Sequence, residues 1–183
     1  DNIVELHIGA CDYSTEIWMN GLFVGSHRGG YSSFSFDITA FIHPGENTIA
    51  IYAEDDTRDP MIPSGKQSHE YNSFGCFYTR TTGIWQTVWL EFMPKSRIET
   101  VRFYPDIQQG TITLTIQFCG TEDFSAEILY KGNPMGNISC SACYGRRTFT
   151  VRLKEAHLWE PGCGRLYDII MRFGKDEVRS YFG

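Results

Sequence analysis

The segment E-I-W-M-N-G-L-F-V, residues 16–24, carries the clearest sign of β structure in this chain. Asn-Gly between two short apolar runs is the strongest short signal for a hairpin, because both residues adopt a positive φ easily. We therefore predict antiparallel strands at residues 16–19 and 22–24, joined at Asn20 and Gly21. On both sides of this hairpin strand patterns recur about every ten residues, without long helical periodicity, which predicts a sandwich or barrel.

The rest of the N-terminal half continues this pattern. Apolar and polar residues alternate at residues 3–8 and 33–38, and further strands are expected at residues 47–52 and 84–92. Asp37 is expected to cap one short helical turn that ends at Phe41. The half should therefore be a sheet structure with little helix.

Residues 55–82 interrupt the strands with a polar stretch punctuated by Gly and Pro. A loop of this length inside a compact domain is usually functional or mobile. Pro94 then breaks the strand pattern, and we place a domain boundary at residues 93–95. The chain should therefore have two domains, residues 1–94 and 95–183.

The C-terminal half is expected to be a compact sandwich. The predicted strands cover residues 97–104, 110–118, 124–130, 147–154, 165–173 and 177–182. Six or seven short strands in about 90 residues are typical of an immunoglobulin-like β-sandwich. The Cys…Trp…Cys arrangement of antibody domains is missing, and Trp159 and Tyr167 are the predicted aromatic anchors of the core.

Composition excludes several classes of protein. With 183 residues, 42% of them hydrophobic, the chain can bury a sizeable core and is not disordered. A net charge of −6 without a basic run argues against nucleic-acid binding, and no apolar stretch is long enough to cross a membrane. The aromatic content of 15% suits either the faces of a β-sheet or the stacking of sugar rings.

The six cysteines include one C-x-x-C pair, Cys140 and Cys143. A structural zinc site needs four ligands and usually a second such pair, and the core is large enough without disulfides. We therefore expect mostly reduced cysteines, no bound metal and no cofactor.

Catalytic motifs are not evident in the sequence. Asp55 and Asp56 form the only conspicuous carboxylate pair, whereas glycoside hydrolysis needs two carboxyl groups about 5 to 9.5 Å apart. Neighbouring side chains in a strand point to opposite faces, so this pair is a weak acid–base combination. A solvated entrance to the loop is the simpler interpretation of the two residues.

Several longer stretches resemble a known family. They are V-E-L-H-I-G-A-C-D-Y, E-I-W-M-N-G-L-F-V-G-S-H-R-G-G-Y-S-S-F-S-F-D-I-T, P-G-E-N-T-I-A-I, G-K-Q and Y-T-R-T-T-G-I-W-Q-T-V-W-L-E. Together they resemble the sugar-binding jelly-roll domain of family-2 glycoside hydrolases, the β-galactosidase and β-glucuronidase family. The later L-W-E-P-G-C-G-R-L-Y-D and V-R-S-Y-F-G are similar to the family's immunoglobulin-like second domain.

The resemblance implies an all-β fold, a partial jelly-roll β-sandwich followed by an immunoglobulin-like β-sandwich. The family's jelly roll begins some strands earlier, so an N-terminally truncated domain is expected. A catalytic barrel would follow Gly183, and both catalytic glutamates belong to that barrel. The resemblance therefore implies a non-catalytic part of a glycosidase that packs beside the barrel and lends loops to its sugar cleft.

Two loops supply the candidate sugar-binding residues. The first loop covers residues 25–31 and the second covers residues 55–82; one more candidate lies at the start of the strand that follows. The candidates are His27, Arg28, Tyr31, Asp55, Asp56, Lys66, Gln67, Arg80 and Trp85. Planar polar side chains can pair with sugar hydroxyl groups, and aromatic rings can stack on sugar faces. Alternatively, Arg28 and Arg80 hold the loops or pair with Asp55 and Glu70, and Trp85 fills a core or interface site.

Other functions stay open at this point. The alternatives are an autonomous carbohydrate-binding module and a β-sandwich oligomerisation module. A truncated sandwich exposes sheet edges that recruit partners, so we expect a homo-oligomer, with residues 3–8 as the pairing strand. A cytoplasmic location is expected.

Overall fold

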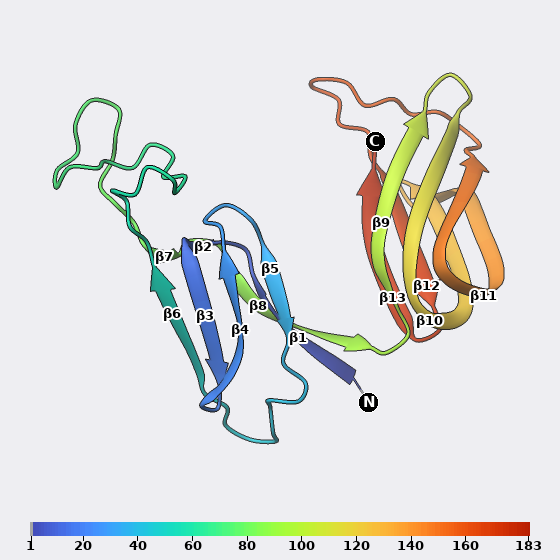
Figure 1. Ribbon diagram of the computed structural model, residues 1–183. Coiled ribbons are helices and arrows are strands. Elements are labelled where there is room, and N and C mark those ends of the chain that lie inside the picture. Colours follow the sequence, from blue (N-terminus) through green and yellow to red (C-terminus); the bar gives the residue numbers. More distant parts are fainter. Residues whose placement is uncertain (1) are drawn as a thin grey trace. The chain divides into compact units, whose positions relative to one another are not determined.

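A computed structural model describes residues 2–183, and this part of the chain is all-β, without a helix (Figure 1). It divides into two compact units, Asn2–Phe92 and Met93–Gly183. We call them the N-terminal and the C-terminal unit and describe each by itself.

The N-terminal unit contains two three-stranded sheets and a two-stranded ribbon. One sheet has the order β5-β1-β8 and the other the order β4-β3-β6, while β2 pairs with β7. Their bounds are β1 Asn2–Ile8, β2 Cys11–Asp12, β3 Ser14–Met19, β4 Leu22–Arg28, β5 Phe34–Asp37, β6 Ile49–Glu54, β7 Gly83–Ile84 and β8 Val88–Pro94. The predicted Asn-Gly hairpin is present between β3 and β4, with Asn20 and Gly21 at positive φ.

Alternation along the strands builds the core of this unit. Val4, Leu6 and Ile8 of β1 and Ile17 and Met19 of β3 are buried in one cluster, because every second side chain of a strand points to the same face. The two sheets therefore share one apolar layer, as in a β-sandwich.

One local expectation for this unit needs correction, and a second one is met. The strand at residues 3–8 was expected to be a free pairing edge, but β1 lies between β5 and β8, so its backbone groups are already used. The expected short turn that ends at Phe41 is present as one hydrogen-bonded turn, and Asp37 caps it. The amide of Phe41 donates to the carbonyl of Ile38 (2.9 Å), and Asp37 accepts from the Thr39 amide (2.9 Å).

The C-terminal unit is built on two 20-residue strands. They are β10 (Thr111–Tyr130) and β11 (Asn133–Arg152), which pair with each other along their length, with register shifts near Phe118–Phe124. The first half of β10 also pairs with β9 (Arg97–Asp106), and its second half pairs with β12 (Tyr167–Phe173), which pairs with β13 (Asp176–Phe182). These pairings make one five-stranded sheet, and buried residues from both halves of β10 form one core, so the sheet folds over on itself as a sandwich.

Strand assignment from sequence was partly wrong here. The predicted strands at residues 110–118 and 124–130 are one strand, because bulges bend β10 from one layer of the sandwich to the other without ending it. Residues 133–144, around the C-x-x-C pair, were left without a strand but belong to β11.

One of the two predicted aromatic anchors lies in the core. Tyr167 is buried and stacks on Phe182, with ring centroids 5.1 Å apart, and its hydroxyl donates to the carbonyl of Glu155 (2.8 Å). Trp159 is 56% exposed, so placing it in the core was wrong. Its segment, between β11 and β12, is irregular, and an aromatic residue outside a strand pattern has no face that must point inward.

Candidate functional site

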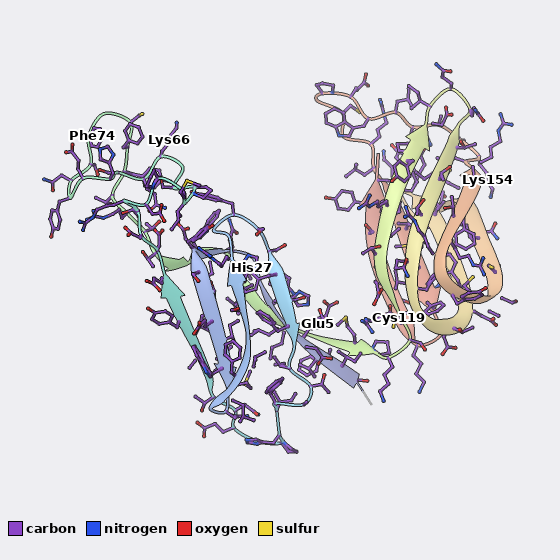
Figure 2. The ribbon with its side chains drawn as sticks, viewed as in Figure 1. Glu5, His27, Lys66, Phe74, Cys119 and Lys154 are labelled. Carbon is purple, nitrogen blue, oxygen red and sulfur yellow. The ribbon has the colours of Figure 1, made fainter. Side chains whose placement is uncertain are left out.

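The long loop of the N-terminal unit, residues 55–82, follows β6 directly and returns into β7. Figure 1 shows it as the green segment beyond the ends of these strands, and Figure 2 places Lys66 and Phe74 on it. Its backbone is tied together by isolated bridges between Gln67 and Tyr78 and between Phe74 and Phe77. The loop therefore has a defined course at the β6 and β7 end of the unit.

A chain of hydrogen bonds through two buried side chains fastens this loop to the sheet. Asp12, at the end of β2, is 4% exposed, and its Oδ2 accepts a 2.7 Å hydrogen bond from Nε2 of Gln67. Oε1 of Gln67 in turn accepts from the Thr81 amide at 2.8 Å. One glutamine side chain thus links the strand ribbon to both arms of the loop.

The first loop joins the same cluster through its glycine and tyrosine. A Cβ at Gly30 would lie 2.2 Å from Oδ1 of Asp12, so only glycine fits against this carboxylate. The carbonyl of Gly30 accepts from Nε1 of Trp85 at 2.8 Å, and the rings of Tyr31 and Trp85 meet edge to face, 5.9 Å apart. The two predicted loops therefore meet at Asp12 and Trp85.

A small cavity lies inside this cluster. Its volume is about 140 Å³, and its lining residues are Asp12, Tyr31, Gln67, Tyr78, Thr81 and Trp85. We call these six residues the loop cluster. A carboxylate, an amide, two phenols and an indole are groups that recognise hydroxyl-rich ligands.

The electrostatics of the cluster are dominated by two carboxylates. Asp55 has both carboxylate oxygens buried, and within residues 2–183 neither has a hydrogen-bond partner. Burial first, then the negative charges of Asp12 and Asp56, raise the pKa of Asp55 above its ordinary value. Partial burial, followed by the charges of Asp12 and Tyr78, likewise raises the pKa of the Tyr31 phenol.

The predicted site residues divide into two groups. The structure brings Tyr31, Gln67 and Trp85 together in the loop cluster and places Asp55 within electrostatic reach of Asp12. Asp55 and Asp56 diverge as expected, since Asp55 is half-buried and Asp56 is exposed. Interpreting both as a solvated entrance to the loop was therefore wrong for Asp55.

The remaining candidates lie outside the cavity lining. His27 of β4, labelled in Figure 2, stacks on Phe34 with ring centroids 4.0 Å apart and contacts Oγ of Ser32 at 3.2 Å. Arg28 lies over the ring of Tyr13 and Arg80 over the ring of Tyr71. No ion pair joins either arginine to Asp55 or Glu70 in residues 2–183, and Lys66 is exposed.

Sequence reasoning missed three members of the loop cluster, namely Asp12, Tyr78 and Thr81. Asp12 carried a usable signal, because a carboxylate directly after the buried run Ala10-Cys11 must find a donor. Tyr78 and Thr81 carried none, since their positions depend on how the loop folds back on Gln67.

In residues 2–183 no group of three or more His, Cys, Asp or Glu side chains could hold a metal ion.

Comparison with known proteins gives a consistent match. Residues 2–94 match the family model of the sugar binding domain of glycosyl hydrolases family 2. A β-galactosidase of Thermoanaerobacter pseudethanolicus is 31% identical over 144 residues, which cover 76% of this chain and 18% of that protein. A putative β-glucuronidase of Formosa agariphila is 32% identical over 102 residues, which cover 56% of this chain and 11% of that protein.

Solved structures agree in fold along the whole chain. The apo structure of Bacteroides uniformis β-glucuronidase 3 has a TM-score of 0.79 at 24% identity. The match covers 100% of this chain and 25% of the Bacteroides uniformis chain. A putative β-galactosidase from Bacteroides fragilis has a TM-score of 0.74 at 26% identity, with 100% and 30% covered. The chain thus spans less than a third of each of these four proteins.

Proposed function

This chain belongs to the glycosyl hydrolases of family 2, through a sugar-binding domain at residues 2–94, and from this premise we propose that it is the non-catalytic N-terminal part of a larger β-glycosidase. In this proposal the N-terminal unit packs beside a catalytic barrel and lends its two loops to the sugar cleft. The C-terminal unit is the immunoglobulin-like domain that follows the N-terminal unit in the sequence. The parent protein hydrolyses O-glycosyl bonds in carbohydrate metabolism.

The loop cluster is the observation that carries this proposal. Asp12 and Gln67 fix the two loops to the sheet, so Tyr31 and Trp85 are held on a rigid base. A cavity of about 140 Å³ is below the roughly 300 Å³ at which small-molecule pockets begin. The loops therefore supply one wall of a sugar site, and a neighbouring domain supplies the rest.

An apolar surface on the C-terminal unit supports a partner domain. A cavity of about 340 Å³ is lined by residues that include Ile107, Leu158, Trp159 and Gly183. Ile107, Leu158 and Trp159 are each at least half exposed, and contiguous exposed apolar groups mark interaction sites. We assign this surface to contact with the barrel, so Trp159→Ala should lower the thermal stability of the longer protein more than that of this chain.

We also propose that the chain associates with itself, through the edge strand β8 and not through β1. Trp89 stacks on His7, and Glu91 pairs with His7 at 2.9 Å, so these three share one face of the sheet. Leu90 and Phe92 lie on the opposite face, which is the core face of β1, yet they are 50% and 65% exposed. An edge strand with an uncovered core face recruits a partner.

Light scattering tests this part. We expect the chain to form oligomers at high concentration, and Leu90→Lys to restore a monomer. A wild-type chain that stays monomeric contradicts it.

A cytoplasmic location also remains part of the proposal, and it fits six cysteines that all have free thiols.

Two assays test the main proposal. The chain alone should hydrolyse no aryl β-galactoside or β-glucuronide, and calorimetry should give millimolar or weaker sugar binding, because each lost hydrogen bond weakens affinity by about 0.5–1.5 kcal/mol. Turnover that Asp55→Asn abolishes would make the chain an enzyme in its own right. Micromolar sugar binding without turnover would instead favour an autonomous carbohydrate-binding module.

In a longer protein that contains this chain, substitution at the loops should change catalysis. We expect Tyr31→Ala, Asp55→Ala and Arg28→Ala to raise KM or lower kcat/KM. His43→Ala is the matched control, since His43 lies before β6 beside Asn47, whereas Asp55 follows β6 at its other end. Equal effects of His43→Ala and Tyr31→Ala would argue against a role of the loops in the cleft.

A further inference from the structure

The outer face of one sheet in the C-terminal unit has an unusual composition. Strand β10 lies between β9 and β11, as Figure 1 shows, and residues directly opposite each other in these ladders share one face. Ile112, Leu114 and Ile116 of β10 are buried in the core, so the residues between them point outward. We call the outward residues of the three strands the arginine–threonine face: Thr100, Arg102, Tyr104, Asp106, Thr111, Thr113, Thr115, Gln117, Arg146, Thr148, Thr150 and Arg152.

Two arginines converge on one pocket of this face. Arg102 of β9 lies opposite Thr115, and Arg146 of β11 lies opposite Gln117, so they approach the middle strand from its two sides. A pocket of about 170 Å³ is lined by these four residues and Thr100. The hydrogen-bonded ladders fix the spacing of the strands, so the pocket is preformed.

These two arginines lack the carboxylate partner that four other arginines of the unit have. Arg97, Arg165, Arg172 and Arg179 each form an ion pair with a glutamate. Arg102 and Arg146 have no ion pair within residues 2–183, although the chain is acidic overall, with a net charge of −6. The only carboxylate on the arginine–threonine face is Asp106, whose Oδ1 accepts from the amides of Gln108 and Gln109 at 3.0 Å.

Two guanidinium groups with neighbouring hydroxyl and amide groups are chemically suited to an oxyanion. Guanidinium binds carboxylate, sulfate and phosphate groups through paired N–H donors. Thr100 and Gln117 add neutral donors at the same pocket. Tyr104, 50% exposed, lies two residues from Arg102 on the same strand face, roughly 7 Å away, where its ring can stack on a sugar.

We propose that Arg102 and Arg146 form an oxyanion-binding subsite that takes the carboxylate or sulfate group of an acidic saccharide, or the same group as a free ion. This site lies on the C-terminal unit and goes beyond the function proposed above. It needs neither the loop cluster nor a catalytic barrel, so it can fail or hold independently of them.

Titration followed by NMR tests the subsite on the 183-residue chain. The probes are sodium sulfate, a uronate oligosaccharide and a neutral oligosaccharide of the same length. We expect shifts at Thr100, Thr115 and Gln117 with the anionic probes, weaker binding at higher NaCl, and no such shifts with the neutral sugar. Shifts with sulfate alone identify a free ion as the ligand, whereas tighter binding of the uronate identifies an acidic saccharide.

The double variant Arg102→Ala/Arg146→Ala should lower the affinity for the anionic probes by at least about ten-fold. Arg179→Ala is the matched control, because Arg179 is an exposed strand arginine of the same unit that is paired with Glu177 at 2.9 Å. The Arg179→Ala variant should bind the anionic probes with the affinity of the wild-type chain. The proposal is overturned if neither anion binds, if the double variant binds as well as the wild type, or if the neutral sugar binds equally.

Discussion

The two units use buried groups for different purposes. In the C-terminal unit, fifteen described residues on both sides of the sandwich form one buried apolar cluster, which includes Phe124, Ile169 and Phe173. In the N-terminal unit the corresponding cluster has seven described members, and a hydrogen-bonded polar chain lies outside it, with Asp12 and Gln67 buried and Thr81 exposed. Apolar packing therefore dominates one unit, whereas directional hydrogen bonds position the loops of the other.

Stability and ligand recognition are therefore expected to depend on different residues of this chain. Apolar contacts are non-directional and tolerate similar shapes, whereas a buried carboxylate with one donor depends on that donor. We therefore expect core substitutions to lower global stability and loop substitutions to change local order. Substitutions in each region can test the contrast.

Loss of a core ring in the C-terminal unit should have the largest effect. Phe124 is 1% exposed and packs on Phe118 and Phe149, with ring centroids 5.2 Å away in each case. Phe124→Ala leaves a cavity and should lower the free energy of unfolding by about 3–5 kcal/mol, as measured by urea denaturation. Phe74→Ala, in the long loop, is the control and should cost less than about 1 kcal/mol. Equal losses would contradict the contrast.

Thiol reactivity distinguishes the same two regions. Cys143 lies in the C-terminal core, and burial, followed by the nearby Cys140 thiol, raises its pKa to about 11 from an ordinary value of 9.0. Because only the thiolate reacts, Cys143 should be alkylated at least about 100-fold more slowly at pH 8 than exposed Cys76 of the loop. Mass spectrometry of iodoacetamide-treated protein measures this ratio. Comparable rates would mean that the core opens readily.

The polar chain can be broken at its centre. Gln67→Ala removes the donor to Asp12 and the acceptor for the Thr81 amide, and should lower the free energy of unfolding by about 2–3 kcal/mol. Hydrogen exchange at Thr81 should become faster, while exchange in the C-terminal unit stays unchanged. Lys66→Ala, one residue away and exposed, is the matched control. If both variants behave alike, the polar chain does not hold the loop.

The same contrast explains what could be predicted from sequence. Alternation and the Asn20-Gly21 turn are local signals, so the all-β fold and the β3–β4 hairpin were predictable. The family resemblance likewise rested on local motifs, most of them within residues 2–94 and two of them in the C-terminal half, and the family is confirmed. The course of β10 through its bulges was not predictable, because the sequence around Gly120 carries the turn signal of an ordinary strand end.

The candidate site was predicted less completely than the fold. Tyr31, Gln67 and Trp85 were identified from loop composition, but their partner Asp12 lies 55 residues from Gln67 in the sequence. Such a contact depends on how β2 and the loop meet in three dimensions. Sugar binding stays a prediction for all nine candidates, and six of them lie outside the cavity lining: His27, Arg28, Asp55, Asp56, Lys66 and Arg80.

The smallest expected effect concerns the charge of Asp55. Its pKa is raised above the ordinary 3.8, chiefly by burial, so the folded state favours the protonated acid more than the unfolded state does. The stability that this group contributes is therefore fully present below pH 3.8 and is lost as the pH rises through the raised value. Asp55→Asn removes the charge and should raise the melting temperature at pH 7 by about 1–3 °C, a small gain because solvent still reaches part of the residue. The gain should disappear at acidic pH, where the wild-type carboxyl is already neutral. Asp56→Asn, at the exposed neighbour, removes only the smallest cause of the raised pKa of Asp55 and should raise the melting temperature at pH 7 by less than Asp55→Asn does. A gain for Asp55→Asn that is the same at pH 3.5 and pH 7 would show that its cause is not the buried charge.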